Sequence, residues 1–174
     1  MTGHGQAGSG WPRGWLPAVA ALACLVLAGC GHAAASATTG AGMTACANAT
    51  HIDRLTIARL NPLHQNFRFV APAQITVTDA RQAQTVARAL CALPPVGHGV
   101  YNCPADWGIR YRLRFAARHH WLPPITIAAT GCRMVTGLRP VRLISGVFGF
   151  WAVLGKAAGL GHASLTTFTG TPRT

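Results

Sequence analysis

Glutamate is absent from this sequence of 174 residues, and acidic residues of any kind are scarce. The only acids are Asp53, Asp79 and Asp106, against 15 basic residues, so the formal net charge is +12. General acid–base catalysis by paired carboxylates needs two acids held close together. Asp79 precedes a helical pattern and is expected to cap that helix, while Asp53 and Asp106 have no acidic neighbour in the sequence. The composition therefore argues against an enzyme of this type.

Other patterns typical of enzymes and metal proteins are also missing. Ser145 and Ser164 lie in no Gly-x-Ser-x-Gly motif, and residues 97–99 (Gly-His-Gly) lack the lysine and the following helix of a phosphate-binding loop. His119 and His120, together with His98, could bind a transition metal, but adjacent histidines in a turn usually point apart. We predict no enzymatic activity, no cofactor and no metal site.

An apolar leader opens the chain. Residues 15–27 form an uncharged run that is too short to span about 30 Å of hydrocarbon but fits the apolar core of a signal peptide. It ends in Leu27-Ala28-Gly29-Cys30, which resembles the lipobox of bacterial lipoproteins. That resemblance implies a signal peptide over residues 1–29, acylation of Cys30, palmitate included, and a lipid anchor on the extracytoplasmic face of the cell membrane. The alternative is secretion with cleavage after residues 35–37 (Ala-Ser-Ala).

The mature chain would keep its positive net charge after this cleavage, because the leader contains a single charged side chain, Arg13. A strongly positive surface attracts polyanions, which outside the cell are phospholipid headgroups, envelope polymers or released nucleic acid. Solubility and attraction to the membrane are sufficient explanations of the charge. No pattern indicates specific recognition of nucleic acid.

The rest of the chain divides into a tether, one domain and a tail. Residues 30–50 carry no charged side chain and are rich in Ala, Gly and Thr, which predicts a flexible tether that is pinned to the domain at Cys46. Apolar periodicity begins at His51 and ends near residue 160. We therefore predict a single extracytoplasmic domain over residues 51–160 and a tail over residues 161–174.

The first half of the domain contains strands followed by a helix. Residues 52–60 predict a strand, and alternation recurs in two short segments at 67–69 and 74–78. Asp79 is expected to cap the next helix, with Gln82 in the capping-box position. Four apolar residues at helical spacing form the helix's buried stripe, and Pro94-Pro95 ends it: Ala83, Val86, Ala87 and Leu90.

The second half repeats this order. Residues 109–115 alternate without a break, residues 124–129 form a second apolar run, and residues 148–160 are apolar at helical spacing. The predicted order of elements is β-β-α-β-β-α. We predict an α+β fold with an antiparallel four-stranded sheet, two helices on one face and two disulfides.

Three arginines on the 109–115 strand are the candidate anion-binding residues. Ile109, Tyr111, Leu113 and Phe115 would face the core, while Arg110, Arg112 and Arg114 would face solvent about 7 Å apart. A polyanion could lie along this row, and three aromatic residues could add flat surfaces beside it: Tyr101, Trp107 and Trp121. The alternative is a solvated face whose charges prevent edge-to-edge pairing.

Four cysteines remain in the domain, and an even number in an exported chain predicts two disulfides. Cys103 precedes the arginine strand and Cys132 follows its partner strand, so a hairpin would bring the two together. We therefore favour Cys103–Cys132 with Cys46–Cys91. The rival pairing is Cys91–Cys103 with Cys46–Cys132, and a zinc site is the functional alternative, although no Cys-x-x-Cys pair is present.

Two families resemble parts of the domain. The run from Cys103 to Gly108 (Cys-Pro-Ala-Asp-Trp-Gly), the Gly131-Cys132 pair and the Phe150-Trp151-x-x-Leu154-Gly155 motif are similar to small actinobacterial secreted lipoproteins without an assigned activity. That resemblance implies an extracytoplasmic domain and no catalytic residues. The stretch from Cys103-Pro104 to Cys132 also resembles the disulfide-stapled hairpin of the subtilisin-inhibitor family, although here the helix precedes Cys91.

Three functions follow from these observations. The leading prediction is a non-enzymatic lipoprotein that binds an envelope component or a partner protein. The second is a secreted protease inhibitor, as the weaker resemblance implies. The third is a binder of anionic envelope polymers through Arg110, Arg112 and Arg114.

Overall fold

The computed structural model describes residues 44–60, 67–145 and 149–173. The chain divides into two compact units, residues 1–35 and 36–174, and every described residue belongs to the second. The predicted signal peptide, Cys30 with its lipobox, and the tether up to residue 43 lie outside the described residues. No helix in the described ranges is long and apolar enough to cross a membrane.

The second unit contains short and long strands and helices. Every strand pair among the described residues is antiparallel, and the mixture of helices with this sheet confirms the predicted α+β class. The elements are, in chain order, β1 (Ile52–Leu60), β2 (Phe67–Arg68), β3 (Gln74–Val77), α1 (Ala80–Ala92), β4 (Arg110–Ala117), β5 (His120–Trp121), β6 (Ile125–Ala128), β7 (Met134–Thr136), β8 (Arg142–Leu143), α2 (Phe150–Ala157), α3 (Leu165–Thr169) and β9 (Thr171–Pro172).

The main sheet is larger than the predicted four strands. Its order is β3-β1-β4-β6-β7-β8, with β5 paired to β4, while β2 and β9 form a separate two-stranded sheet. The predicted count is wrong because β5, β7 and β8 are two or three residues long, too short to show alternation. The two longest strands, β1 and β4, lie side by side at the centre of the sheet.

Helix α1 forms as its sequence predicts, except for one capping bond. The Asp79 carboxylate accepts hydrogen bonds from the backbone N–H groups of Arg81 and Gln82, at 2.8 and 3.2 Å. The capping box is not completed, because the side-chain Oε1 of Gln82 is buried without a hydrogen-bond partner. The predicted apolar stripe from Ala83 to Leu90 is fully buried, and the helix ends just before Leu93 and Pro94.

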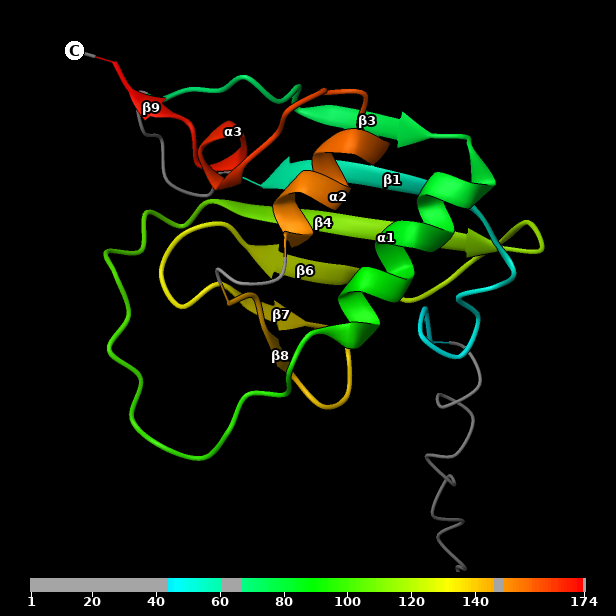
Figure 1. Cartoon of the computed structure of the whole chain (residues 1–174), viewed down its shortest axis with the longest axis horizontal. Coiled ribbons are helices and arrows are strands. Elements are labelled where there is room, and N and C mark those ends of the chain that lie inside the picture. Colours follow the sequence, from blue (N-terminus) through cyan, green and yellow to red (C-terminus); the bar gives the residue numbers. More distant parts are fainter. Residues whose placement is uncertain (1–43, 61–66, 146–148, 174) are drawn as a thin grey trace, which may run out of the picture. The chain divides into compact units, whose positions relative to one another are not determined.

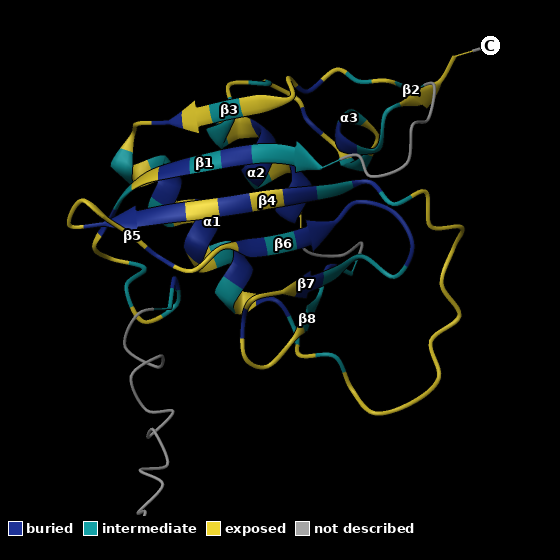
Figure 2. Ribbon diagram, turned by 180° about the vertical axis from the view of Figure 1, so that it is seen from behind, coloured by how far each residue is buried: buried dark blue, intermediate teal, exposed yellow. Residues whose placement is uncertain are grey.

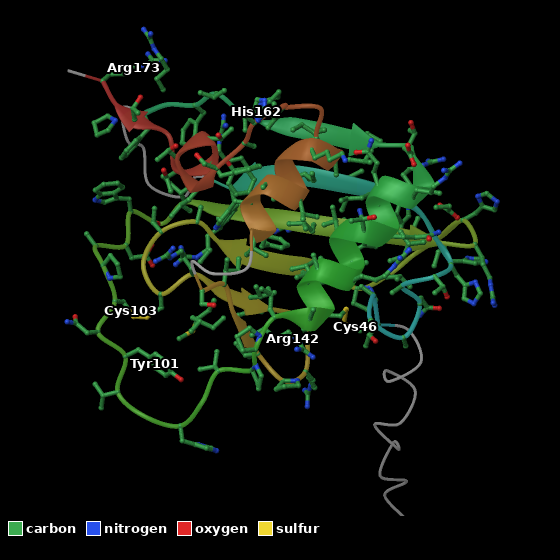
Figure 3. The ribbon with its side chains drawn as sticks, in the orientation of Figure 1. Cys46, Tyr101, Cys103, Arg142, His162 and Arg173 are labelled. Atoms are coloured by element: carbon green, nitrogen blue, oxygen red, sulfur yellow. A yellow bond between two sulfur atoms is a disulfide. The ribbon has the colours of Figure 1, made fainter. Side chains whose placement is uncertain are left out.

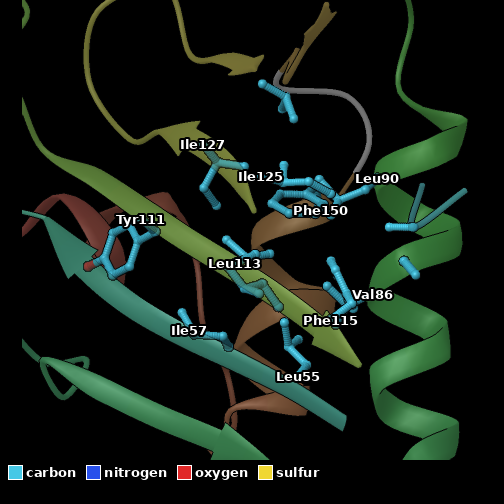
Figure 4. Close-up of a cluster of buried hydrophobic side chains, with 14 of the residues drawn as sticks. Leu55, Ile57, Val86, Leu90, Tyr111, Leu113, Phe115, Ile125, Ile127 and Phe150 are labelled. Carbon is cyan, nitrogen blue, oxygen red and sulfur yellow. The ribbon is translucent and has the colours of Figure 1, made fainter. Parts of the chain in front are cut away.

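The helices α1 and α2 cover one face of the sheet (Figure 1). Seen from behind, the other face carries no helix of the described residues (Figure 2). Strand β4 alternates accordingly: Tyr111, Leu113 and Phe115 are buried in the layer between sheet and helices, which Figure 4 shows with apolar side chains of β1, β6, α1 and α2. The hydrophobic core therefore lies on one side of the sheet only.

A third helix lies in the segment that the sequence analysis assigned to a tail. Phe168 of α3 is fully buried, and its ring packs against Tyr111 and Trp151 at centroid distances of 5.4 and 5.1 Å. The Tyr111 hydroxyl donates a hydrogen bond to the Phe168 carbonyl oxygen at 2.8 Å. Burial raises the pKa of Tyr111, against a smaller lowering by the nearby Arg59, so the phenol stays protonated and keeps this bond. The folded part thus extends past residue 160.

Both favoured disulfides are present. Cys46 bonds to Cys91 near the end of α1, and Cys103 bonds to Cys132 across the ends of the β4–β6 hairpin. The segment from Thr44 to Thr50, at the end of the predicted tether, forms turns that pack onto the domain, with Ala45 buried. This end of the tether is therefore part of the folded unit.

Candidate anion-binding face

The uncovered face of the sheet displays the arginines of β4. In the strand register, Thr56 of β1 lies opposite Arg114, and Thr126 of β6 lies opposite Arg112. Residues in register share a face, so hydroxyl groups flank the guanidinium groups. The register continues from Thr56 to Thr76 of β3 and from Thr126 to Thr136 of β7. We call this surface the arginine face: Arg110, Arg112, Arg114, Thr56, Thr76, Thr126 and Thr136.

Arg112 and Arg114 are exposed, and among the described residues neither has a carboxylate partner. Arg54 of β1 joins them, because it is exposed and lies opposite Ala116 on the same face. Sequence reasoning missed Arg54, because its place beside the arginines of β4 depends on the pairing of β1 with β4. The guanidinium groups of Arg54, Arg112 and Arg114 are therefore available to bind an anion.

Arg110 differs from the other two arginines of the row. Its guanidinium makes a two-point contact with Asp106, with Nη1–Oδ1 and Nη2–Oδ2 distances of 3.1 and 2.7 Å. A bidentate pair of this kind neutralises the charge and fixes the side chain. Asp106 thus has a basic partner that the sequence analysis did not predict, and Arg110 is held by the protein itself.

Asp106 also anchors the long loop between α1 and β4. Its carboxylate accepts hydrogen bonds from the Thr130 hydroxyl at 2.7 Å and from the Gly108 N–H at 2.9 Å. Gly131 makes room for this contact, since a Cβ there would lie 2.8 Å from the Asp106 side chain and its φ is +66°. Figure 3 shows Cys103 on the same loop, so the disulfide and the carboxylate fix adjacent parts of it.

We expect Asp106→Asn to destabilise the protein in a pH-dependent way. Hydrogen bonding from Arg110, supported by Thr130 and Gly108, holds the pKa of the Asp106 carboxyl well below its usual value of 3.8. A lowered folded-state pKa contributes stability that is present above pH 4 and is lost as the pH falls further. The side chain is 42 % exposed, so we expect a cost of only about 1 kcal/mol at pH 7.

Guanidinium unfolding at pH 7, 5 and 3 measures this effect. The gap in unfolding free energy between the wild type and D106N should shrink toward pH 3, where the wild-type carboxylate begins to lose its advantage over the amide. A gap that stays constant with pH would show that Asp106 acts through its shape and not through its charge.

Each of the three aspartates of the chain accepts a hydrogen bond from the protein backbone. Asp53 accepts a hydrogen bond from the backbone N–H of His119 at 2.8 Å, and Asp79 caps α1. Together with Asp106, all three carboxylates accept backbone N–H groups at turns or helix ends. None of them is paired with the exposed arginines Arg54, Arg112 or Arg114, whose positive charge is left without local compensation.

The three predicted aromatic residues have different positions. The Trp121 ring lies beside the guanidinium of Arg114, at 5.0 Å from the ring centroid. Trp107 packs against Phe67 of β2 at 5.4 Å, and Tyr101 donates a hydrogen bond to the Gly97 carbonyl oxygen within its own loop. Trp121 is thus the member of the group that contacts an arginine of the arginine face.

Two hollows of the described part bear on the candidate site and its opposite side. One hollow of about 230 Å³ lies at the Arg110 end of the arginine face, and its lining includes Asp106, Thr130 and Arg133. A groove of about 400 Å³ between α1 and α2 is lined by Arg81 and Lys156 among others. No three His, Cys, Asp or Glu side chains of the described residues converge as metal ligands; His98, His119 and His120 form no such group.

Comparison of the whole chain with protein-family models, with curated proteins and with solved structures finds no match.

Proposed function

We propose that this chain is a lipid-anchored, non-enzymatic protein of the extracytoplasmic membrane face that binds an anionic envelope polymer. The observation that carries the proposal is the arginine face, where Arg112 and Arg114 are exposed on a sheet surface that no described helix covers. Asp53 and Asp79 are bound elsewhere and Asp106 pairs with Arg110, so Arg112 and Arg114 keep their positive charge.

The geometry of the face suits a repeating anion better than a single small one. Alternate residues of a strand stand about 7 Å apart, so Arg112 and Arg114 would contact successive anionic groups of an extended polymer. Each guanidinium can form two parallel hydrogen bonds to a carboxylate or phosphate. The neighbouring hydroxyls of Thr56 and Thr126 would donate hydrogen bonds to, and accept them from, the uncharged groups of the polymer that lie between its anionic groups.

The location follows from the leader. A short apolar run that ends in Leu27-Ala28-Gly29-Cys30 supports export and acylation of Cys30. Two disulfides, Cys46–Cys91 and Cys103–Cys132, support an oxidising compartment. An anchored protein with a basic face would meet envelope polymers at the membrane surface, where both are concentrated.

Charge reversal tests the proposal. We expect the double variant R112E/R114E to weaken binding of the full-length chain to polygalacturonate and to polyphosphate by about 30-fold or more, since two charge-assisted contacts are lost and become repulsive. The salt dependence of the remaining binding should be less steep. Binding is measured by titrating the chain, in a neutral detergent, with each polymer at several salt concentrations.

The double variant R81E/R88E is the matched control. Both arginines are exposed on α1, on the other side of the sheet, and the change in net charge is the same. We expect this variant to lose binding less than threefold. An equal loss in the two double variants would mean that net charge alone governs binding, and it would refute a defined site on the arginine face.

A further inference from the structure

Trp121 extends the arginine face with an aromatic surface. In the register of β4 and β5, Trp121 lies opposite Ala116, which in turn lies opposite Arg54 of β1. These three residues therefore point to the same side of the sheet as Arg112 and Arg114. Ala116 is only 3 % exposed even though no described helix lies over this side, whereas Trp121 itself is 41 % exposed.

One cation–π contact favours the orientation of the indole ring. The Arg114 guanidinium lies 5.0 Å from the ring centroid, a distance at which the cation is attracted to the aromatic face. The hairpin fixes the backbone as well, because Arg118 and His119 both adopt positive φ angles in the two-residue turn before β5. An ordered, partly exposed ring beside uncompensated cations is a preorganised binding element.

The chemistry of the surface combines three kinds of group within one face. Guanidinium groups bind carboxylates or phosphates, threonine hydroxyls exchange hydrogen bonds with alcohols, and an exposed indole packs against flat apolar surfaces. A polymer of charged sugars offers all three partners, since a pyranose ring has an apolar C–H face, several hydroxyls and an acidic substituent. A polyphosphate chain offers only negative charge and has no apolar face that could stack on the Trp121 ring.

We infer that the arginine face selects an anionic polysaccharide, with the Trp121 ring stacking on one sugar and Arg112 binding the acidic group of another sugar along the chain. This inference rests on the proposed function and names its ligand class. Single-stranded nucleic acid also combines charge with flat rings, but proteins that bind it present several aromatic side chains to successive bases. Trp121 is the one aromatic residue that the described register places on this face, which favours the sugar polymer.

The test compares three probes on the full-length chain in a neutral detergent: polygalacturonate, polyphosphate and oligothymidylate. We expect W121A to weaken polygalacturonate binding about tenfold and polyphosphate binding less than twofold. W107A is the matched control, because Trp107 is also partly exposed but packs against Phe67. It should leave all three affinities unchanged.

Two further variants separate stacking from a structural role. W121F keeps an aromatic ring and should restore most of the polygalacturonate affinity, whereas W121L still covers Ala116 but should not restore it. Equal losses for polygalacturonate and polyphosphate in W121A would overturn the inference while leaving the proposed function standing. A larger loss for oligothymidylate than for polygalacturonate would also overturn it. Failure of the wild type to bind any of the three probes would refute the proposed function itself.

Discussion

Phe115→Ala is expected to lower the free energy of unfolding by about 3–5 kcal/mol. The Phe115 ring is 0 % exposed and lies in β4, opposite Leu55 of β1. Figure 4 shows it in the cluster with Val86 of α1, in the layer between sheet and helix. Truncation would remove the ring and leave a cavity that a domain cross-linked by two disulfides cannot fully close. A small domain has about 5–15 kcal/mol of stability in total, so this loss is a large part of it.

Guanidinium unfolding followed by tryptophan fluorescence measures the change. Phe115→Leu, which keeps most of the apolar volume, should cost only about 1–1.5 kcal/mol. Val100→Ala is the surface control, because Val100 is 103 % exposed on the long loop, and it should change stability by less than about 0.5 kcal/mol. A cost below about 1 kcal/mol for Phe115→Ala would contradict the position of Phe115 in the core.

Long periodic segments were predictable from the sequence. The alternation of residues 109–115 correctly separates buried Tyr111 from exposed Arg112, because adjacent side chains of a strand point to opposite faces. The four apolar residues of α1 recur at helical spacing and are all buried. In both elements one periodicity extends over at least two repeats, so local sequence alone determines which side faces the core.

Short elements were not predictable in the same way. Strands β7 and β8 have three and two residues, and each forms by pairing with the strand before it, β7 with β6 and β8 with β7. Helix α3 has five residues and is held by the single buried ring of Phe168 against Tyr111, 57 positions earlier in the chain. Such elements depend on contacts between distant segments, which no local pattern records.

The candidate site was predictable in part. The arginine row follows from alternation, but the pairing of Arg110 with Asp106 depends on a loop whose position is set by Thr130 and Gly131, more than 20 residues away. Trp121 was named together with Tyr101 and Trp107, and no sequence pattern distinguished it from them. Its register with Ala116 comes from a turn of Arg and His at positive φ, where Asn and Gly are the usual signal.

The cysteine pairing was predictable from topology. A hairpin that begins after Cys103 and ends before Cys132 brings its two ends together, and the structure has this hairpin in β4 and β6. The second pair, Cys46 with Cys91, then follows from the two cysteines that remain. The reasoning succeeds because both strands of the hairpin are long enough to be recognised.

Removal of the Cys46–Cys91 bond by C46S/C91S is the second large effect that we expect, a loss of about 4 kcal/mol in unfolding free energy. The bond joins residues 45 positions apart, and cross-links over longer separations remove more entropy from the unfolded chain. The corresponding double variant C103S/C132S breaks a bond over 29 positions and should cost slightly less, about 3.5 kcal/mol. Thermal and guanidinium unfolding of both variants under non-reducing conditions compare these losses.

The variants C46S/C91S and C103S/C132S should differ more in polymer affinity than in unfolding free energy. Cys46 ties the end of the tether to α1, on the helical side of the sheet, so C46S/C91S should keep its polygalacturonate affinity well below its melting temperature. Cys132 lines the hollow at the Arg110 end of the arginine face and Cys103 holds the loop of Asp106, so C103S/C132S should bind more weakly at the same fraction folded. The reverse order, with C46S/C91S losing binding first, would place the polymer on the helical side and contradict a site on the arginine face.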